Sequence, residues 1–519
     1  MSWNYLAATK YDFNPSIQVE LRRRNRIKWA VTKRLKQSFL PQMSEELCQM
    51  VAGYILCEMA AIALHERAKD VQPATCTIDL TQDVYATYID IEGILYLQSL
   101  RNTPLQDKGS SRCIYDAQQA RAIRTIYIEY DHLGIRGIYF DAPNREGLSS
   151  RDCCGVWWTA VARESRLLRI TTKSDGMKLR RLVDTIDSMA ASSPPLPVYG
   201  WPTPQLVCKV IDLDTCEIAK NSSGSLRMSS LDCNAQLTTG YSVAISGFRI
   251  SKICAHRWDT SASLHNDLDS SSNCTLWMYM PIDENEFLSQ IWAIRHPECG
   301  LAGLMFRTNL DRKVLFGRYI VHPKFRIQSH LIYSTTNSPS RIYFNEWDPF
   351  DDEKCIKYIG IKSDAAETDR ATNQRLKMSE SLCPLPLTPT SKPPYTQYNE
   401  PWHYTNCVLE NVAEIACCVD GTVAHRPIIG MMVYYDDGHR ACIGQYRLDW
   451  VLDKSPVDRS MLLRLGLAKT RKNLPYVATI TLGNPITPVS KSLSWMDVPW
   501  HGKLEWWFSQ RQCRLCHCD

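Results

Sequence analysis

A stretch of 19 residues occurs in two versions in this chain, and it constrains the fold more than any other feature. Residues 301–319 read LAGLMFRTNLDRKVLFGRY, and residues 428–446 read IIGMMVYYDDGHRACIGQY. The same residue types stand at matching places: Gly303/Gly430, Met305/Met432, Gly317/Gly444 and Tyr319/Tyr446. A segment repeated without gaps predicts two copies of one structural unit.

Each copy has the pattern of a β-hairpin. An apolar run follows the first glycine, a polar centre comes next (308–312 and 435–439), and a second apolar run ends on the other glycine. Asp437-Gly438 predicts a tight type I′ turn. Acidic-then-apolar strands upstream, at 284–294 and 409–419, extend each unit to three strands. A fainter third copy lies at 126–140, so we expect antiparallel units that cover one another's apolar faces.

The pattern along the chain predicts a mainly β (α+β) protein, β-prism- or β-sandwich-like, with a helical segment before a large antiparallel region. A helical pattern returns near residues 461–469. Residues 363–401 are rich in Ser, Thr and Pro, which predicts a disordered insertion that serves as a plain linker rather than as an SH3 or WW ligand. The predicted segments are 1–72 (helical), 73–362 (β-rich), 363–401 (insertion) and 402–519 (β-rich, with a Cys-rich tail).

Two helices are expected near the beginning of the sequence. Residues 16–37 carry eight Lys or Arg against the single Glu20. We favour a solvated basic face over a nucleic-acid or nuclear-import patch, with these apolar residues turned inward: Leu21, Ile27, Ala30, Val31 and Leu35. Ser44 caps a second helix that runs to about Ala68. Its apolar stripe is assigned to the core: Leu47, Met50, Val51, Tyr54, Ile55, Met59 and Ile62.

The composition of the chain limits which cellular location and which partners we expect. The 519 residues hold 60 basic and 55 acidic side chains, for a net charge of +5, so nucleic acid is not expected as a partner. The start lacks a signal-peptide pattern and no apolar run reaches the roughly 20 residues that span a bilayer, which predicts no membrane association. The 21 scattered cysteines predict free, mostly buried thiols in a reducing compartment. We therefore expect a cytoplasmic protein, with the nucleus as the alternative location.

The repeated region resembles known families. Residues 283–317, DENEFLSQIWAIRHPECGLAGLMFRTNLDRKVLFG, are similar to the strand pattern of jacalin-related lectins. The chain more broadly resembles a family of filamentous-fungal proteins that join a helix beginning L-P…ELC-x-M to β-rich repeats. The matching residues here are Leu40-Pro41, 46–51 and 430–445. The helix is also similar to the opening of an F-box, which docks on a ubiquitin-ligase adaptor.

Motifs of the common enzyme classes are missing from the sequence. Phosphate-binding loops, dinucleotide fingerprints, G-x-S-x-G, H-E-x-x-H and the kinase motifs do not occur. Catalytic residues are therefore unknown, and neither a cofactor nor a metal is expected. The tail carries Cys513, Cys516, His517 and Cys518, and thiolates at C-x-x-C spacing can bind zinc. Since no second C-x-x-C completes a site, we favour a frayed end with free thiols and leave the metal question open.

Recognition is the leading functional hypothesis. The sequence predicts a non-catalytic adaptor whose β region binds a protein or glycan. The candidate contact residues are aromatic or lie at a hairpin tip: Trp277, Tyr279, Asp436, Asp437, His439 and Arg440. For the tryptophans in general, burial between sheets is the favoured interpretation. The alternative is an enzyme or accessory factor of a small-molecule, secondary-metabolite pathway, with a site assembled from residues such as Asp131, His132 and His256.

Overall fold

The computed structural model contains two compact units. One comprises Met1–Val207 with Lys220–Met228, and the other Cys208–Ala219 with Ser229–Asp519. The residues that the structure describes are 15, 17–39, 41–55, 58, 74–91, 93–105, 111–118, 125–140, 155–162, 169–184, 198–204, 208–219, 225–258, 275–296, 300–319, 327–335, 339–347, 355–362, 388–394, 400–483 and 493–519. The four segments predicted from composition stay a prediction.

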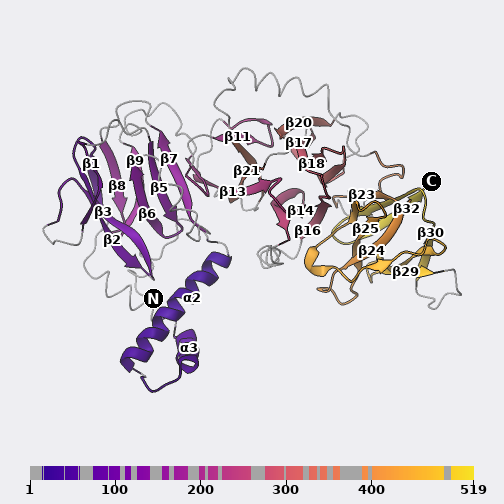
Figure 1. Ribbon diagram of the computed structural model, residues 1–519, viewed down its shortest axis with the longest axis horizontal. Helices are drawn as coiled ribbons and strands as arrows, with labels where there is room; N and C mark the ends of the chain where they lie inside the picture. The colour runs from indigo at the N-terminus through magenta and orange to yellow at the C-terminus, as the bar shows by residue number, and fades with distance from the viewer. Residues whose placement is uncertain are drawn as a thin grey trace. The chain divides into compact units, whose positions relative to one another are not determined.

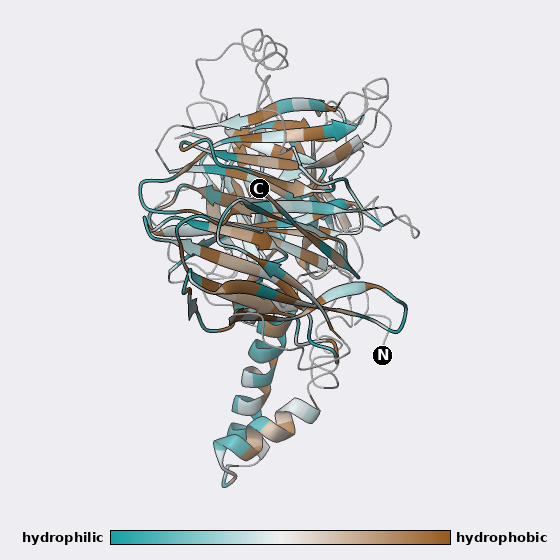
Figure 2. Ribbon diagram, turned by 90° about the vertical axis from the view of Figure 1, so that its right-hand side faces the viewer, coloured by the Kyte–Doolittle hydropathy of each residue, from teal (hydrophilic) through white to brown (hydrophobic). Residues whose placement is uncertain are grey.

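Helices form the first described part of unit 1 (Figure 1). Helix α2 (Ile17–Arg34) leads into a π-helical turn, η1 (Leu35–Phe39). Ile27, Val31 and Leu35 are buried, as expected, in a stripe of four-residue spacing that includes Arg23. Leu21 and Ala30 are exposed, so their expected burial is wrong: they lie off that stripe. Figure 2 shows most of α2 in hydrophilic colours.

Helix α3 (Glu45–Tyr54) packs on α2 through a face that only partly agrees with the one expected, since Val51 and Ile55 are partly buried against α2 as expected. The Ser44 hydroxyl caps it by accepting a 3.4 Å hydrogen bond from the Leu47 backbone N–H. The small side chains of Cys48 and Ala52 are fully buried, since they allow close approach of α2. Leu47, Met50 and Tyr54 are exposed, so their assignment to the core is wrong. The expected extension to Ala68 lies outside the described residues.

Antiparallel sheets complete unit 1. Their strand orders are β1-β8-β9, β3-β2-β4 and β6-β5-β7. The strands are β1 (Ala74–Asp79), β2 (Val84–Ile91), β3 (Ile94–Arg101), β4 (Ser111–Tyr115), β5 (Thr125–Asp131), β6 (Gly134–Phe140), β7 (Trp157–Ala162), β8 (Arg169–Ser174) and β9 (Leu179–Asp184). A short strand, β10 (Val198–Gly200), pairs in parallel with the first residues of β13 (Ser225–Cys233).

Unit 2 is built almost entirely of antiparallel strands around one large apolar core. Its first strands are β11 (Cys208–Asp212), β12 (Glu217–Ile218), β14 (Thr238–Ser246), β15 (Arg249–Arg257), β16 (Thr275–Pro281), β17 (Leu288–His296), β18 (Gly300–Thr308), β19 (Lys313–Gly317), β20 (Gln328–Ser334), β21 (Ser340–Trp347) and β22 (Tyr358–Lys362). The later elements are β23 (His403–Val408), β24 (Val412–Val419), β25 (Ile428–Tyr435), β26 (Arg440–Gly444), η4 (Leu448–Trp450), β27 (Ser455–Pro456), β28 (Leu462–Lys469), β29 (Pro475–Gly483), β30 (Ser494–Val498), β31 (Lys503–Phe508) and β32 (Cys513–Cys518). The expected mainly β, α+β fold is confirmed.

The two repeated segments form the same three-stranded unit. In β17-β18-β19 and β24-β25-β26 the closing glycines pair alike, Gly303 with Gly317 and Gly430 with Gly444. The first two strands of each unit also show register shifts at matching places, near both ends of the ladder. The alternation of buried side chains agrees as well: Phe306 and Val433 enter the large core, whereas Met305 and Met432 enter small separate clusters on the opposite faces.

The segment at 126–140 is a hairpin with a different connection. Strand β5 lies between β6 and β7, both of which follow it in sequence. In the two good copies the middle strand instead lies between the strand before it and the strand after it. The third copy is therefore a hairpin but not the same unit.

Two local expectations in the last part of the chain are wrong. Residues 462–469 form strand β28 instead of a helix, because Leu463 and Leu465 alternate into the core while β29 and β30 pair on either side. The Cys-rich tail is not frayed, since β32 pairs along β31 and buries Cys513. The described cysteines are free thiols, and most are buried.

Part of the predicted disordered insertion is ordered. Within residues 388–394, the backbone N–H groups of Thr390 and Ser391 donate to the Glu505 carboxylate at 2.8 and 2.9 Å. The Tyr404 hydroxyl donates to the same carboxylate at 2.6 Å. Burial alone would raise the pKa of Glu505, but these hydrogen bonds outweigh it and lower the pKa to about 2.

We predict that Glu505→Gln destabilises the protein by about 3 kcal/mol, because the neutral amide cannot accept all of these hydrogen bonds. The ordinary carboxyl pKa of 4.5 applies in the unfolded chain. The stabilisation that the ionised Glu505 carboxylate provides is therefore present above about pH 5 and is lost as the pH falls toward 2. Urea unfolding between pH 2 and 7 measures it. The exposed Glu414→Gln is the control, with an expected loss below about 1 kcal/mol; equal losses in both variants would contradict the prediction.

Candidate functional site

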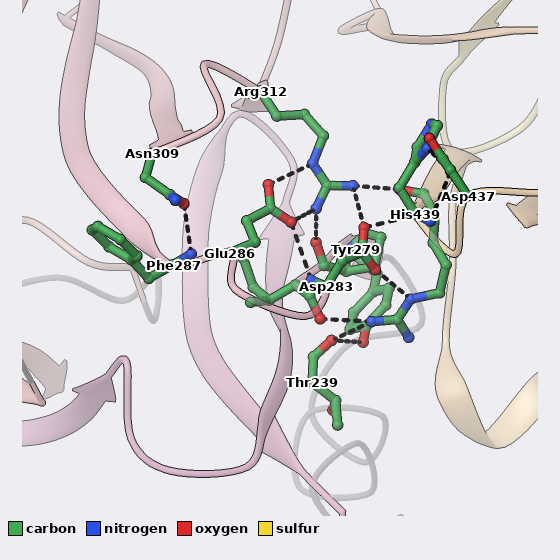
Figure 3. Close-up of polar contacts among 12 residues, drawn as sticks. Thr239, Tyr279, Asp283, Glu286, Phe287, Asn309, Arg312, Asp437 and His439 are labelled. Atoms are coloured by element: carbon green, nitrogen blue, oxygen red, sulfur yellow. Dashed lines mark hydrogen bonds and ion pairs between the residues drawn. The ribbon is translucent and has the colours of Figure 1, made fainter. Parts of the chain in front are cut away.

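A cluster of polar side chains in unit 2 lies where the tips of the two repeated hairpins meet one loop (Figure 3). The loop follows β16 and carries Asp283 and Glu286. Arg312 comes from the turn between β18 and β19, and Arg440 is the first residue of β26. Side chains from both repeats therefore converge on the same two carboxylates.

Arg440 clasps Asp283. Its Nε donates to Oδ1 at 2.7 Å, and its backbone N–H donates to Oδ2 at 3.0 Å. Its Nη2 also donates to the carbonyl oxygen of Ile282 at 2.6 Å. Burial by itself lowers the pKa of Arg440, but the hydrogen bond and ion pair with Asp283 outweigh burial and raise that pKa. The guanidinium is thus firmly charged and held by both side chain and backbone.

Arg312 clasps Glu286 in a bidentate manner. Its Nε donates to Oε1 at 2.9 Å, while Nη2 pairs with Oε2. The same guanidinium also donates to the carbonyl oxygens of Pro281 and Arg440, so it joins the loop to the second hairpin. The Glu286 side chain is only 1% exposed, and it accepts the Asp283 backbone N–H at 3.1 Å. Two cations and two carboxylates therefore neutralise each other, which is a structural arrangement. We call the four residues, Asp283, Glu286, Arg312 and Arg440, the clamp.

Arg440 is the one predicted contact residue that belongs to this clamp. Tyr279 lies beside it, but it is buried, stacks on Tyr446 and donates to the Thr239 carbonyl oxygen at 2.8 Å. Burial raises the pKa of Tyr279 to about 12. Trp277 is 2% exposed and sits two residues earlier in β16. Both aromatics therefore pack in the protein interior and present no open ring face.

The other predicted contact residues are exposed at the tip of the second hairpin. The side chains of Asp436, Asp437 and His439 are 52%, 69% and 47% exposed. Asp436 pairs with Arg459, and Asp437 pairs with His439. The His439 backbone N–H lowers the pKa of Asp437. The His439 ring stacks on the Tyr435 ring, with the two ring centres 3.8 Å apart. The tip is therefore polar and conformationally restrained.

The turn geometry differs from the type I′ expectation. Gly438 has a φ of 89°, but Asp437 has no positive φ, which a type I′ turn requires. Tyr435 N–H donates to the His439 carbonyl across a three-residue loop, and Thr308 N–H does the same to Arg312. Asp311, with a φ of 62°, is the counterpart of Gly438. Both tips are therefore three-residue loops whose last residue has a positive φ, instead of two-residue type I′ turns.

Sequence reasoning missed Asp283, Glu286 and Arg312 as parts of this cluster. A signal for Arg312 existed in the repeat, because it occupies the place of His439 in the first copy. Asp283 and Glu286 come from a loop outside the repeated segment. Their partnership with the two hairpins depends on the tertiary structure alone.

The residues of the enzyme alternative are engaged in local contacts. The Asp131 carboxylate accepts from Tyr96 Oη at 2.7 Å, from Arg136 Nε at 2.8 Å and from the Leu133 N–H at 2.7 Å. His132 is buried, which lowers its pKa to about 4. His256 belongs to the other unit, where it hydrogen-bonds Ser242 at 2.7 Å. Asp131 and His256 are therefore engaged with groups of their own unit, and His132 is buried.

Comparison with known proteins yields no identification. No model of a known protein family matches the chain, and no curated protein matches it. Within the described residues, no helix is both long and apolar enough to cross a membrane. The resemblances in the repeat and in the helix therefore stay hypotheses.

We predict that Arg312→Met lowers the free energy of unfolding by about 3 kcal/mol, because it leaves the buried Glu286 carboxylate without its cation. Chemical denaturation measures the change. The exposed Arg459→Met, which breaks the pair with Asp436, is the matched control and should cost less than about 1 kcal/mol. Adding Glu286→Leu to Arg312→Met should recover part of the loss; a double variant as unstable as the sum of the single variants would refute the clamp.

Proposed function

We propose that this protein is a non-catalytic recognition protein and that the tip of its second repeated hairpin contacts a protein partner. The observation that carries the proposal is the anchoring of an exposed polar tip on a partly buried clamp. Arg440 holds the base of the tip against Asp283, while Asp436, Asp437 and His439 extend into solvent. A surface restrained before binding loses less conformational entropy when a partner binds.

Burial of the aromatics favours a protein over a glycan. Sugar rings stack on exposed aromatic faces, yet Trp277, Tyr279, Trp506 and Trp507 are each at most 4% exposed. A glycan stays the second candidate because Trp258, the residue after β15, is 82% exposed. The lectin-like strand pattern supports that second candidate only if a stacking residue such as Trp258 takes part.

The helical pair supports an adaptor role. Leu47, Met50 and Tyr54 recur at three- and four-residue spacing along α3 and are 47%, 57% and 86% exposed. An exposed apolar stripe of this kind suits the face that an F-box-like helix offers to a ubiquitin-ligase adaptor. The free thiols suit a reducing compartment, so we place the protein in the cytoplasm or the nucleus.

The hairpin proposal is tested by affinity capture. The full chain and the triple variant Asp436→Ala/Asp437→Ala/His439→Ala are used as baits in a cell lysate, and the captured proteins are identified by mass spectrometry. We expect a defined partner whose affinity for the triple variant is at least tenfold weaker, because the exposed charges and the imidazole are gone.

A second exposed turn of unit 2 supplies the control. Arg471→Ala/Lys472→Ala changes the turn between β28 and β29 and should leave the capture intact. Equal capture by all three baits would reject the hairpin tip as the contact surface. Glycan-array binding that Trp258→Ala abolishes would instead favour the second candidate.

The adaptor role is tested at α3. We predict that Leu47→Asp/Met50→Asp prevents co-purification with a ubiquitin-ligase adaptor while the unfolding midpoint changes little, because both side chains face solvent. Gln49→Asp, at another exposed position of the same helix, is the charge control. Co-purification that survives the double substitution would exclude this face, and the hairpin proposal would stand unaffected.

A further inference from the structure

Two histidines and a carboxylate converge at the open end of the last hairpin of unit 2. His501 precedes β31, His517 lies within β32 and Asp519 follows β32. Nδ1 of His501 lies 3.7 Å from Oδ1 of Asp519, and Nδ1 of His517 lies 3.9 Å from the same oxygen. One ligand atom from each of the three residues falls within 4.8 Å of the others.

The backbone of the hairpin creates this convergence. His517 and Asp519 are two residues apart in an extended chain, so their side chains point to one face. Gly502 has a φ of 74°, and a Cβ there would lie 2.5 Å from the carbonyl oxygen of Cys518. Only glycine therefore allows His501 and the end of β32 to approach so closely. The Gly502 N–H donates to Glu410 at 2.9 Å, which fixes the turn.

A second observation concerns the orientation of the His517 ring. Its Nε2 lies 2.8 Å from the carbonyl oxygen of His501, which can only accept. Nε2 therefore carries the proton in the neutral ring, and Nδ1 keeps its lone pair on the side of Asp519. Metal-binding histidines are oriented in this way, with the remote nitrogen donating to a backbone carbonyl.

We propose that His501, His517 and Asp519 bind one divalent transition-metal ion, Zn²⁺ foremost, with water completing the coordination. Two imidazoles and a carboxylate suit zinc rather than calcium or magnesium, which prefer oxygen ligands alone. Ligand atoms around a tetrahedral zinc are roughly 3.4 Å apart. Small rotations of the side chains of His501 and Asp519, which are 62% and 85% exposed, close the remaining gap.

The neighbouring cysteines are not part of this site. Cys516 and Cys518 alternate with His517 along β32, so their side chains point to the opposite face. Cys513 is buried, and burial raises the pKa of its thiol to about 12. The metal therefore has nitrogen and oxygen ligands, unlike the cysteine-based zinc site that the C-x-x-C spacing of the tail suggested.

The test is titration of the untagged full chain with ZnCl₂ by calorimetry, alongside the variants His501→Gln and His517→Gln. We expect one zinc site in the wild type that each variant weakens by about 100-fold. His425→Gln, an exposed histidine elsewhere in unit 2, should change nothing at this site. Unfolding midpoints equal to that of the wild type, measured in a chelator, show that the variants are folded. If His517→Gln does not fold, zinc binding by the variant at the more exposed His501, His501→Gln, tests the proposal.

Cobalt distinguishes the ligand sets. Co²⁺ at the same stoichiometry should give a visible spectrum without the sulfur-to-cobalt charge-transfer band that thiolates produce, and Cys516→Ser/Cys518→Ser should bind like the wild type. Zinc binding that both histidine variants retain would overturn the proposal. Binding that depends on the cysteines would overturn it as well, since the tail would then hold a thiolate site.

Discussion

The ion pairs of Arg312 with Glu286 and of Arg440 with Asp283 join the two repeated units of this protein. Each repeat contributes three neighbouring strands to a larger sheet, and the tips of the two repeats meet at one loop. The loop after β16 supplies both carboxylates, and Arg312 donates as well to the backbone of Arg440. Because Glu286 is almost fully buried, its charge must be matched, and the matching cation comes from the first hairpin. The exposed surface of the second tip depends on this buried neutralisation.

Strand β23 provides a second link, at the other ends of the hairpins. The His403 ring donates from Nδ1 to the Gly317 carbonyl oxygen at 2.6 Å, and Thr405 Oγ1 accepts from the Gly444 N–H at 2.7 Å. Burial lowers the pKa of His403 to about 4, so the ring is neutral near pH 7. One strand thus contacts the closing glycine of each repeat. The units are tied together at the tips by charge and at the glycines by neutral hydrogen bonds.

The proposals follow from which polar groups are exposed. In the clamp every charge has a partner, so the clamp itself offers structure rather than chemistry. The groups exposed around it, at the second hairpin tip, suit recognition of a partner. At the end of β31 and β32, by contrast, the Nδ1 atoms of His501 and His517 lie within 4 Å of one Asp519 carboxylate oxygen, and this set of nitrogen and oxygen donors suits the transition-metal ion that we propose there.

The sequence by itself determined the β-rich class, the two equivalent hairpins and their shared alternation, because these follow from periodicity and glycine placement within short segments. It also located Asp436, Asp437, His439 and Arg440 at a hairpin tip. Only the tertiary structure decided which faces are covered: Trp277 is interior and Leu47 exposed, although both are large apolar residues. It likewise decided that residues 390 and 391 dock on Glu505 and that residues 462–469 form a strand. Burial and ion pairing depend on contacts between segments far apart in the chain, so the local sequence of one segment does not determine which segment packs against it.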